Sequence, residues 1–530
     1  MKQAVAIAGA TLFRPGQDPL PGATVVMRDG SIESITSDPP RGATVIDATG
    51  RWVIPGLIDA HIHFFQSGGL YTRPDIIDLT SRVPYDDERR RIRERLDDTF
   101  ARYVRCGVTS VMDCGGPFWN FDVRTQAARS PLAPRVALTG PLVSTYGPKA
   151  LQTEDPPIIE CATAGDARAL VKRQLPHRPD FVKIWYILLN RPAESHLPIA
   201  RAAIDEAHAA GLRVAVHATE LETARAVVQA GADILVHSVF DREVDEAFLE
   251  LLKRRGVVYI PTLMVVERYR QTLSHSLRMT TAELRLGNPW VVSTLFDRFK
   301  DQARPSAPAG AANLRRVHAG GITVAAGTDA GNIGTPHGPA IFRELEAMVE
   351  AGLTPAQALT CATLGGARAL GRERDLGSID PCKRADLVVL DGDPTANIAN
   401  VSMIRLVVKD GRAWRPEEIL AESPVDLVQR QVNAYNAGHL EAFLETYSDE
   451  IEISGALELR GKAAMRERYG RLFAENPKNH CEITRRVVEG RVVTDDEHIT
   501  GRADGVERRA RARYEVDGGL IRRVAFLPTE

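Results

Sequence analysis

The chain has 530 residues, and at about 100–200 residues per domain this length predicts two to four domains. Hydrophobic residues make up 44% and charged residues 26%, which excludes a mainly disordered chain, a collagen-like chain and a coiled-coil rod. The formal net charge is −2, so no overall basic field predicts a nucleic-acid or anionic-membrane partner.

The six cysteines are scattered without CxxC spacing, which predicts neither a zinc ribbon nor a disulfide scaffold and is typical of a reducing cytoplasm. No stretch approaches the roughly 18–20 apolar residues of a membrane helix. Lys2 and the following AVAIAGATLF have the charge and apolar run of a short signal peptide. A second strand-like run after the turn-rich FRPGQDPLPG favours a first strand instead, so we expect a cytoplasmic protein.

Residues 1–56 alternate in short apolar runs broken by PG, DG and TG turn signals, which predicts strands. From 57 to 370, eight short apolar runs alternate with helical stretches, the pattern of a (β/α)8 TIM barrel in the α/β class. The helices expected there include 87–106, 201–210, 221–230 and 243–255. Strand pattern returns over 371–415, and these strands can join the N-terminal ones in a β-sandwich, because a lone pair is marginally stable.

Residues 416–424 are predicted to be a linker, since they separate two different patterns. In 425–530, two helices joined at Ala437–Gly438 and a third amphipathic helix precede strands with apolar–polar alternation and DG and GG turns. Helices followed by strands without interleaving predict a separate α+β domain. The arginines of the strands at 484–523 are interpreted as a solvated sheet face, not as a nucleic-acid patch.

The clearest chemical signal is His61-Ile62-His63, at the end of the apolar run IPGLIDAHIHF. Residues i and i+2 of a strand point to the same face, so both imidazoles can reach one ion. The alternative is two core histidines, each of which would need a hydrogen-bond partner. An HxH triplet is common, so this pair alone does not establish a metal site.

Further ligand-type side chains end later predicted strands: His217 in RVAVHA, His237 in DILVHSV and Asp329 in VAAGTDAG. The carboxyl ends of all strands of a βα-barrel face one mouth, so residues far apart in sequence can converge there. Histidines and a carboxylate are the ligands expected for Zn²⁺ or a neighbouring first-row ion. The set therefore predicts a metal centre.

Lys183 lies in the middle of the predicted strand DFVKIW, among apolar residues. A lysine in that position must either reach water or lose its charge. A neutral lysine amine can react with CO₂ to form a carbamate, an anion that can bridge two cations.

The strings VIPGLIDAHIHF, VKIW, VHA, VHS and AGTDAG together resemble the amidohydrolase superfamily, and most closely its prolidase-like and imidazolonepropionase-like branch. The helix-like AQALTCATLGGARAL and the following LGSIDPCKRADLVVLDGDP also fit, so the resemblance covers about residues 1–415. It implies a split β-sandwich built from both flanks of the barrel. Two departures are Cys382-Lys383, where the family usually has Gly-Lys, and GPLVSTYGP, which lacks the GGH run of prolidase-like relatives.

Carried over by motif, the resemblance implies two divalent metal ions, with zinc the metal expected. His61, His63 and Asp329 would bind the more buried ion, and His217 and His237 the second, with carboxylated Lys183 between them. The same six residues are thus the expected ligand set: His61, His63, Lys183, His217, His237 and Asp329.

The mechanism expected from these charges is hydrolysis. Two cations about 3.5–4 Å apart lower the pKa of a bridging water toward ~7, and one of them polarises the scissile carbonyl. Asp329 would take the proton of the attacking water and deliver it to the leaving amine. His237 or Tyr186 would stabilise the developing oxyanion.

Two weaker substrate-side candidates follow from loop positions. His337 in GNIGTPHGP lies after the last predicted strand and can contact substrate, although a loop histidine is more often solvated. The stretch 264–307, with Tyr269, Trp290 and Phe296, is too long for a plain βα turn. It is either a helical lid over the site or an ordinary helical insertion.

The C-terminal domain from Val425 resembles the NTF2-like (SnoaL, ketosteroid-isomerase-like) cone fold. The likeness rests on VNAYNAGHLEAFLETYSDEIEI, on GKAAMRERYGRLF and on the final strands to FLP. This fold carries unrelated functions, and the sequence offers no convincing acid–base pair for its pocket. A role in assembly or substrate gating is therefore favoured.

We accordingly expect a binuclear metal-dependent hydrolase of small-molecule amide bonds, acting on dipeptides or N-acyl amino acids, and assembled as a homo-oligomer. One alternative is a mononuclear relative that hydrolyses cyclic amides or deaminates. The other is an inactive barrel that serves as a binding scaffold, against which the intact ligand set argues.

Overall fold

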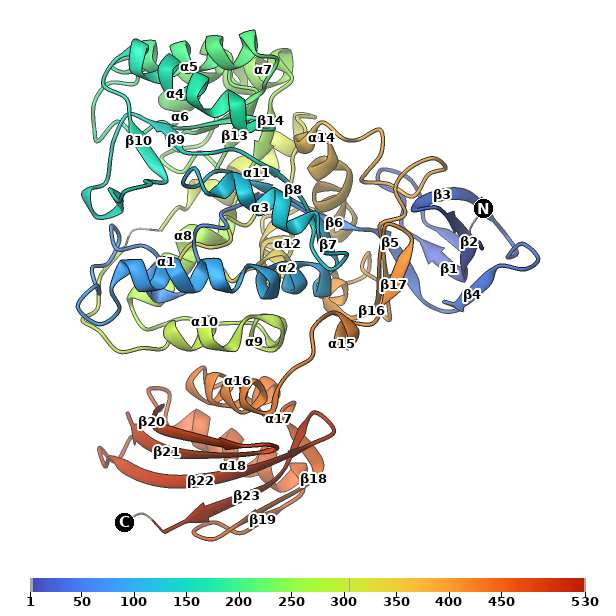
Figure 1. Ribbon diagram of the computed structural model, residues 1–530, viewed down its shortest axis with the longest axis vertical. Coiled ribbons are helices and arrows are strands. Elements are labelled where there is room, and N and C mark those ends of the chain that lie inside the picture. The colour runs from blue at the N-terminus through green and yellow to red at the C-terminus, as the bar shows by residue number, and fades with distance from the viewer. Residues whose placement is uncertain (1–2, 305, 529–530) are drawn as a thin grey trace. The chain divides into compact units, whose positions relative to one another are not determined.

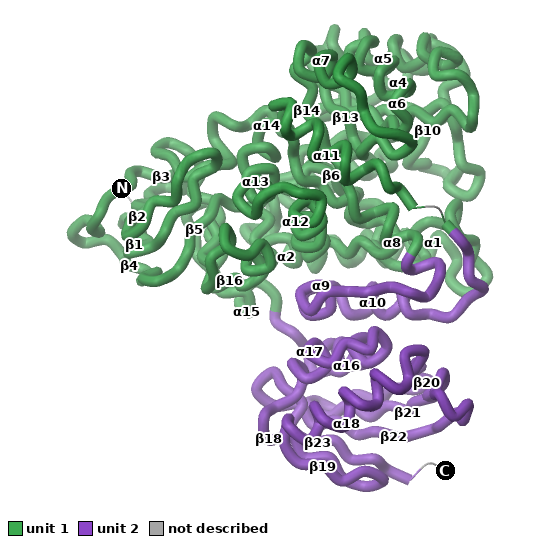
Figure 2. Tube along the Cα trace, turned by 180° about the vertical axis from the view of Figure 1, so that it is seen from behind, with its two compact units in different colours: residues 1–270, 304–420 green, residues 271–303, 421–530 purple. Residues whose placement is uncertain are grey.

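The computed structural model describes residues 3–304 and 306–528. They form two compact units, one of residues 1–270 and 304–420 and the other of residues 271–303 and 421–530 (Figure 2). Within the described ranges, no helix is both long and apolar enough to cross a membrane.

The first unit contains an eight-stranded sheet built from both of its sequence flanks (Figure 1). Its strands are β1 (Val5–Leu12), β2 (Leu20–Arg28), β3 (Ser31–Thr36), β4 (Thr44–Asp47), β5 (Trp52–Pro55), β15 (Leu387–Leu390), β16 (Ile404–Lys409) and β17 (Arg412–Trp414). The flanks join where β5 and β15 pair antiparallel, with Pro55 opposite Leu387. Residues of both flanks, such as Ile7, Val25 and Val389, fill one common core.

Parallel strands alternate with helices between these flanks. One sheet has the order β6-β7-β8 and the other β10-β9-β11-β12-β13-β14. Their bounds are β6 (Leu57–Ile62), β7 (Val108–Asp113), β8 (Arg135–Leu138), β9 (Leu142–Ser144), β10 (Ile158–Glu160), β11 (Val182–Trp185), β12 (Val214–His217), β13 (Ile234–Val236) and β14 (Val258–Ile260). Most of these strands are buried along their whole length, as parallel strands covered by helices are.

Residues 322–329, predicted as an eighth strand, lie between the two parallel sheets, and isolated bridges pair Val324 with Tyr259 and Ala330 with Ile62. The Tyr259 amide donates to the carbonyl of Thr323 at 2.9 Å, and the Ala60 amide donates to that of Ala326 at 2.9 Å. The amide of Asp329 donates to the carbonyl of His61 at 2.7 Å. The mixed α/β, parallel architecture is therefore confirmed, whereas a continuous eighth strand and a closed barrel stay predictions.

The helices of the first unit cover these strands. They are α1 (Tyr85–Glu94), α2 (Leu96–Arg105), α3 (Asn120–Ala127), α4 (Ala164–Gln174), α5 (Leu197–Ala209), α6 (Leu221–Ala230), α7 (Glu246–Arg255), α8 (Leu263–Leu273), α11 (Ala309–Ala319), α12 (Ala340–Glu350), α13 (Pro355–Thr360), α14 (Gly366–Leu370) and α15 (Pro416–Ile419). Helix α6 ends because Gly231 adopts a left-handed φ of 116°. Helix α15 forms the start of the segment predicted to be a linker. This part of the segment packs on the first unit, where Ile419 is buried beside Ala101 and Val104.

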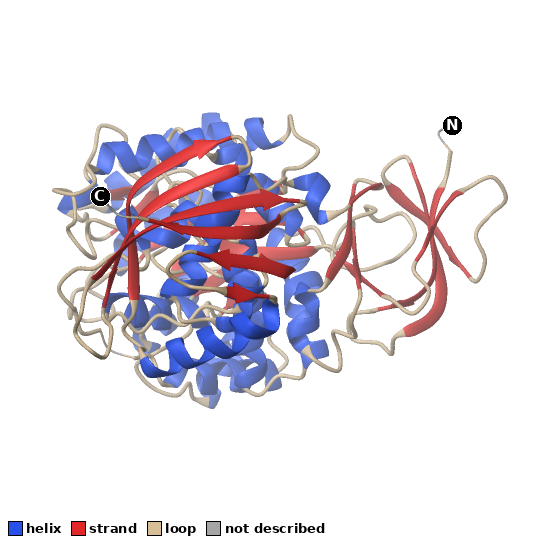
Figure 3. Cartoon of the chain, turned by 90° about the horizontal axis from the view of Figure 1, so that it is seen from below, coloured by secondary structure: helices blue, strands red, loops and turns tan. Residues whose placement is uncertain are grey.

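The second unit has one curved six-stranded sheet in the order β19-β18-β23-β22-β21-β20, with helices packed on it (Figure 3). Its strands are β18 (Tyr447–Ser454), β19 (Leu459–Arg460), β20 (His480–Glu489), β21 (Val492–Thr500), β22 (Arg508–Asp517) and β23 (Leu520–Leu527). Its helices are α9 (Thr281–Leu286), α10 (Pro289–Thr294), α16 (Pro424–Asn436), α17 (Leu440–Leu444) and α18 (Lys462–Glu475).

Helices α9 and α10 belong to this second unit although the sequence boundaries place them in the first. The indole Nε1 of Trp290 donates to Asp426 at 2.8 Å, and the Asn433 amide donates to the carbonyl of Pro289 at 2.7 Å. These contacts join α10 to α16, so the insertion is part of the C-terminal unit's core.

Candidate metal centre

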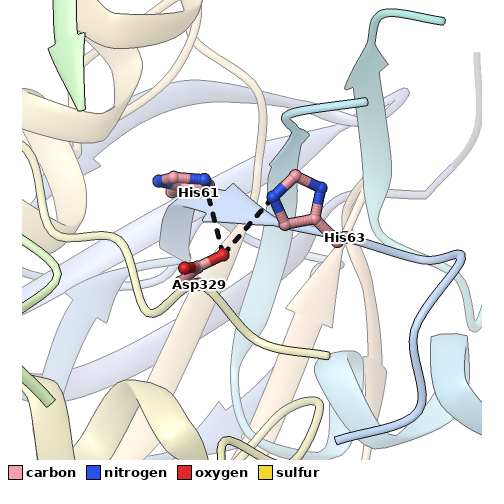
Figure 4. Close-up of side chains that lie close together, drawn as sticks. All are labelled: His61, His63 and Asp329. Carbon is pink, nitrogen blue, oxygen red and sulfur yellow. Dashed lines mark ion pairs between the residues drawn. The ribbon is translucent and has the colours of Figure 1, made fainter. Parts of the chain in front are cut away.

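Two histidines and a carboxylate meet at the end of β6. His61 lies in β6, His63 follows it directly, and Asp329 ends the connecting stretch 322–329. Asp329 Oδ1 lies 3.5 Å from His61 Nε2 and 3.3 Å from His63 Nε2 (Figure 4). The three side chains are buried, and their candidate ligand atoms lie within 4.8 Å of one another. The predicted HxH–Asp cluster is thus present as a geometric group.

The backbone at this end of the strands is strained. Asp329 has a φ of 56° and His237 a φ of 72°, and Thr262, which follows β14, has a φ of 43°. Non-glycine residues avoid this left-handed region at a cost of order 1–3 kcal/mol each, and such residues cluster at functional sites.

Gly327 in AGTDAG explains why the connecting stretch can approach β6 so closely. A Cβ at Gly327 would lie 2.8 Å from the Cβ of His61 and 2.6 Å from Cγ2 of Ile260. Only glycine allows this approach without displacing the two neighbouring strands.

A second buried carboxylate, Asp59, fixes the position of two members of the cluster. Its Oδ2 accepts the Thr328 hydroxyl at 2.6 Å, and its Oδ1 accepts the backbone amides of Thr328 at 3.0 Å and His61 at 3.3 Å. Asp59 does not line the pocket, and through these bonds it holds His61 and the residue before Asp329 in place. Its burial raises its pKa to about 7.

His217 and His237 lie beside the first cluster, as predicted. His217 ends β12 and His237 directly follows β13. Their ring centroids are 4.4 Å apart, and the centroid of His237 is 4.9 Å from that of His61. Neighbouring parallel strands end together, so four imidazoles from three strands converge.

Lys183 in β11 points into the same pocket and is buried, with a relative exposure of 1%. Its Nζ has no hydrogen-bond partner among the described residues. Burial lowers the pKa of this amine, which favours the neutral form. An unpartnered buried amine is costly as a charge and is chemically available as a nucleophile.

The protonation states suit a metal centre. Burial lowers the pKa of His61, His217 and His237 well below the usual value, and that of His63 to about 3, so all four imidazoles are neutral near pH 7. His63 Nδ1 lies 2.8 Å from the carbonyl of Gly115, which can only accept, so Nδ1 carries the proton and Nε2 has a free lone pair.

The donor set fits a divalent transition metal ion. His61 Nδ1, Lys183 Nζ and Asp329 Oδ1 are buried without a hydrogen bond from any described residue. Native proteins rarely leave buried polar atoms unsatisfied, and such groups point to an ion or another bound species. Neutral imidazoles with a carboxylate are ligands for Zn²⁺ or a related ion.

His63 and Asp329 of the cluster line a pocket of about 310 Å³, together with Lys183, His217 and His237. Trp185, Phe240 and Val265 contribute apolar walls, so a small ligand would be largely desolvated there. Tyr269 from α8 also lines the pocket, which places the first part of the predicted lid or insertion beside the cluster.

The pocket also contains a hydrogen-bonded set of polar side chains that the sequence motifs did not predict. Arg73 binds Asp75 through two nitrogens at 2.6 and 2.8 Å and donates to Asn332 at 2.7 Å. The Tyr269 hydroxyl also donates to Asn332, at 2.5 Å. Arg73, Tyr269 and Asn332 all line the pocket. The sequence signal for the Arg73–Asp75 pair is the string RPD, in which the two charged residues are separated by one proline.

The two predicted substrate contacts lie elsewhere. The Tyr186 hydroxyl donates to the carbonyl of Ala193 at 2.7 Å, and its neighbour Trp185 lines the pocket instead. His337 is buried, with Nδ1 2.8 Å from the Tyr103 hydroxyl and Nε2 2.8 Å from the carbonyl of Gln66. Both ring nitrogens of His337 are engaged by the protein, so His337 holds its loop in place.

Sequence comparison matches residues 52–414, more than half of the chain, to the amidohydrolase family, and residues 428–524 to the SnoaL-like domain. An uncharacterized protein of Mycobacterium tuberculosis is 27% identical over 395 residues, which cover 72% of this chain and 90% of that protein. The imidazolonepropionase of Mycolicibacterium smegmatis is 25% identical over 428 residues, covering 75% and 92% of the two chains.

Among solved structures, a Xaa-Pro dipeptidase with methionine bound in its active site aligns with a TM-score of 0.62 and 21% identity. The alignment covers 78% of this chain and 100% of that one. It shows a shared fold. Together with the two family matches, it confirms the resemblance expected from the motifs.

Proposed function

This chain belongs to the amidohydrolase family and is a hydrolase of carbon–nitrogen bonds, and we propose that it cleaves small-molecule amides with two divalent cations. The observation that carries the proposal is the convergence of six ligand-type side chains, of which five line one pocket and the sixth, His61, lies next to them. They are His61, His63, Lys183, His217, His237 and Asp329.

The framework that we propose is a closed (β/α)8 barrel of residues 57–370, flanked by sandwich strands from 1–56 and 371–415. The backbone hydrogen bonds of Thr323 with Tyr259 in β14 and of Ala326 with Ala60 in β6 support the closure. A closed ring would hold all strand ends around one pocket, which the ligand set requires.

We assign Lys183 as a carboxylated lysine. Its neutral amine would form an N–C bond with CO₂ and release one proton to solvent, leaving an anionic carbamate. The absence of any described partner for Nζ, together with its burial, supports this assignment. His237 is assigned as a ligand through Nε2, because its Nδ1 is 2.7 Å from the Thr262 hydroxyl.

Bound divalent cations supply an acidified water nucleophile and a polarised amide carbonyl. Asp329 then accepts the proton of the attacking water and delivers it to the leaving nitrogen. In the metal-free protein, burial raises the pKa of Asp329 to about 6. Apolar walls such as Trp185 and Phe240 would exclude bulk water from the reaction.

Dipeptides and N-acyl amino acids are the substrates that we propose to test. The pocket of about 310 Å³ favours a short substrate, and its apolar walls favour an apolar acyl or side-chain group. The likeness to a Xaa-Pro dipeptidase places dipeptides first in the panel.

The test measures metal content and turnover on the same samples. We expect two divalent ions per chain after supply of zinc and bicarbonate, and turnover of at least one panel amide that a chelator abolishes. Lys183→Ala should lose most of the second ion, while Lys172→Ala, an exposed lysine at 64% side-chain exposure, should keep both. Equal metal content in wild type and Lys183→Ala would exclude the bridging role of Lys183.

A general-base test separates catalysis from metal binding. Asp329→Asn keeps one ligating oxygen but removes the proton acceptor, and a positioned base contributes about 10²–10⁴ in rate. We therefore expect kcat to fall by at least about 10² at full metal content. Retention of most of the kcat by a fully loaded Asp329→Asn would identify another base.

The second candidate is a mononuclear hydrolase of cyclic amides or a deaminase. It is favoured by one observation, the close group of His61, His63 and Asp329, which alone can hold one ion. A single ion per chain in wild type, with turnover of a cyclic amide but not of dipeptides, would select this candidate.

A further inference from the structure

The second unit encloses a cavity of its own, of about 310 Å³. Its lining comes from helices α16 and α18 and from the concave side of the sheet, all within residues 431–526. This volume is in the range of small-molecule sites. The hydrolase chemistry proposed above assigns no role to it.

The inner end of the cavity is polar. Glu497 is buried at 8% exposure, and its Oε1 accepts the Tyr514 hydroxyl at 2.6 Å. Gln431, at 5% exposure, also lines the cavity, and its Oε1 accepts no hydrogen bond within the described part of the chain. A buried acceptor without a donor is costly, so this end is suited to a ligand that donates a hydrogen bond.

The middle of the cavity is apolar and largely aromatic. Tyr469, Tyr447 and Phe526 line it together with aliphatic side chains such as Leu472 and Val432. Such walls bind a ring through burial of apolar area and through stacked or edge-on aromatic contacts.

The mouth of the cavity is cationic. Arg468, Arg502 and Arg509 line it, and in the described ranges none of the three forms a salt bridge with a carboxylate. Arg502 donates to the Tyr435 hydroxyl at 3.1 Å, while its buried Nε has no partner among the described residues. A guanidinium with an unused donor beside the entrance is suited to a planar carboxylate.

We propose that this cavity is a binding site for an aromatic carboxylate that carries a hydrogen-bond donor at the opposite end of its ring. The donor binds the acceptors of Glu497 and Gln431, the ring lies between the aromatic walls, and the carboxylate binds Arg502. Each of the three ligand features thus has a matching group in the lining. Glu497 and Gln431 are buried, whereas Arg502 is half-buried and Arg509 is exposed.

The test uses the full-length protein and isothermal titration calorimetry with 4-hydroxybenzoate as the probe. Benzoate lacks the donor, and methyl 4-hydroxybenzoate lacks the charge. We expect saturable binding of 4-hydroxybenzoate, with each analogue weaker by at least about tenfold. Chelation should leave binding unchanged, because the metal centre lies in the other unit.

Two variants locate the probe. Arg502→Gln should abolish the preference for the acid over the methyl ester, and Glu497→Gln, which is isosteric, should reduce the preference for 4-hydroxybenzoate over benzoate. Arg523→Gln, an arginine at 66% side-chain exposure that does not line the cavity, is the matched control and should bind like wild type.

Circular dichroism of each variant distinguishes a lost contact from a lost fold, and the two variants change different groups of the proposed site. Absence of saturable binding by all three probes would overturn the proposal. So would binding that is unchanged in both variants, or binding that chelation removes.

Discussion

Helix α8 begins on a buried carboxylate from a distant helix, and this contact gives a sharp prediction. Glu344 in α12 has no exposed surface; its Oε1 accepts the amide of Leu263 at 2.8 Å, and its Oε2 accepts that of Met264 at 3.0 Å. These amides are among the unpaired donors of the first turn of α8. Helix α8 in turn supplies Val265 and Tyr269 to the pocket of the metal centre.

We predict that Glu344→Ala destabilises the protein and weakens substrate binding. The substitution leaves two buried amides without an acceptor, at about 1–3 kcal/mol each, so the free energy of unfolding should fall by about 2–6 kcal/mol. Glu344→Gln retains one acceptor oxygen and should lose about half of that. Because α8 forms a wall of the pocket, KM for the amide substrate should rise more than kcat falls.

The assay is urea unfolding followed by circular dichroism, combined with steady-state kinetics on the same preparations. Glu350→Gln is the matched control, since Glu350 lies on the same helix at 64% side-chain exposure and its carboxylate pairs with Arg343 at the surface. It should leave stability and KM within experimental error. A cost below about 1 kcal/mol for Glu344→Ala, with unchanged KM, would refute the capping argument.

Three further predictions concern pH, metal and the second unit. Burial raises the pKa of Glu497 to about 7 from 4.5, so the folded protein holds this proton more tightly and the free energy of unfolding should decrease by up to about 3 kcal/mol from pH 4.5 to 7. Glu497→Gln should remove that slope in urea titrations, and an unchanged slope would contradict it. Chelation should cost the first unit about 4 kcal/mol if metal is present at about 1,000 times Kd, seen as a lower calorimetric Tm; an unchanged Tm would contradict a bound metal. Trp290→Ala removes the hydrogen bond to Asp426 and should reduce the free energy of unfolding of the second unit by about 2–3 kcal/mol. The Tm of the second unit alone should therefore fall.

The ligand-type residues could be predicted because parallel strands impose a simple geometry. His61 and His63 share a face by the two-residue period of a strand, and His217, His237 and Asp329 occur where predicted strands end. The structure brings all five together, since the ends of neighbouring parallel strands lie side by side. Their assignment as metal ligands remains a proposal.

The same period explains why Trp185, and not Tyr186, lines the pocket. Lys183 and Trp185 are two residues apart and share a face, whereas Tyr186 is three residues from Lys183 and points to the other face. The structure accordingly has Trp185 in the pocket and the Tyr186 hydroxyl on Ala193. Alternation was therefore the better guide than the chemistry of the phenol.

Contacts between distant segments could not be predicted in this way. Arg73 and Asn332 are 259 residues apart, and Glu344 meets Leu263 across 81 residues. Neither local pattern nor strand period specifies such pairs, because they depend on how loops cross at the strand ends. The affiliation of residues 271–303 with the second unit is of the same kind: the helical pattern was visible, but its packing partner was not.

Two buried carboxylates that do not line the pocket hold parts of its wall in place. Asp59 binds Thr328 across 269 residues, and Glu344 binds the first turn of α8, so each ties one side of the site to the framework. Asp329, His237 and Thr262 adopt left-handed backbone angles that cost of order 1–3 kcal/mol each, and surrounding contacts must hold them there. Asp59 accepts the amides of His61 and Thr328, and the Asp329 amide bonds directly to the His61 carbonyl. The position of the proposed base thus depends in part on a carboxylate that takes no part in the chemistry.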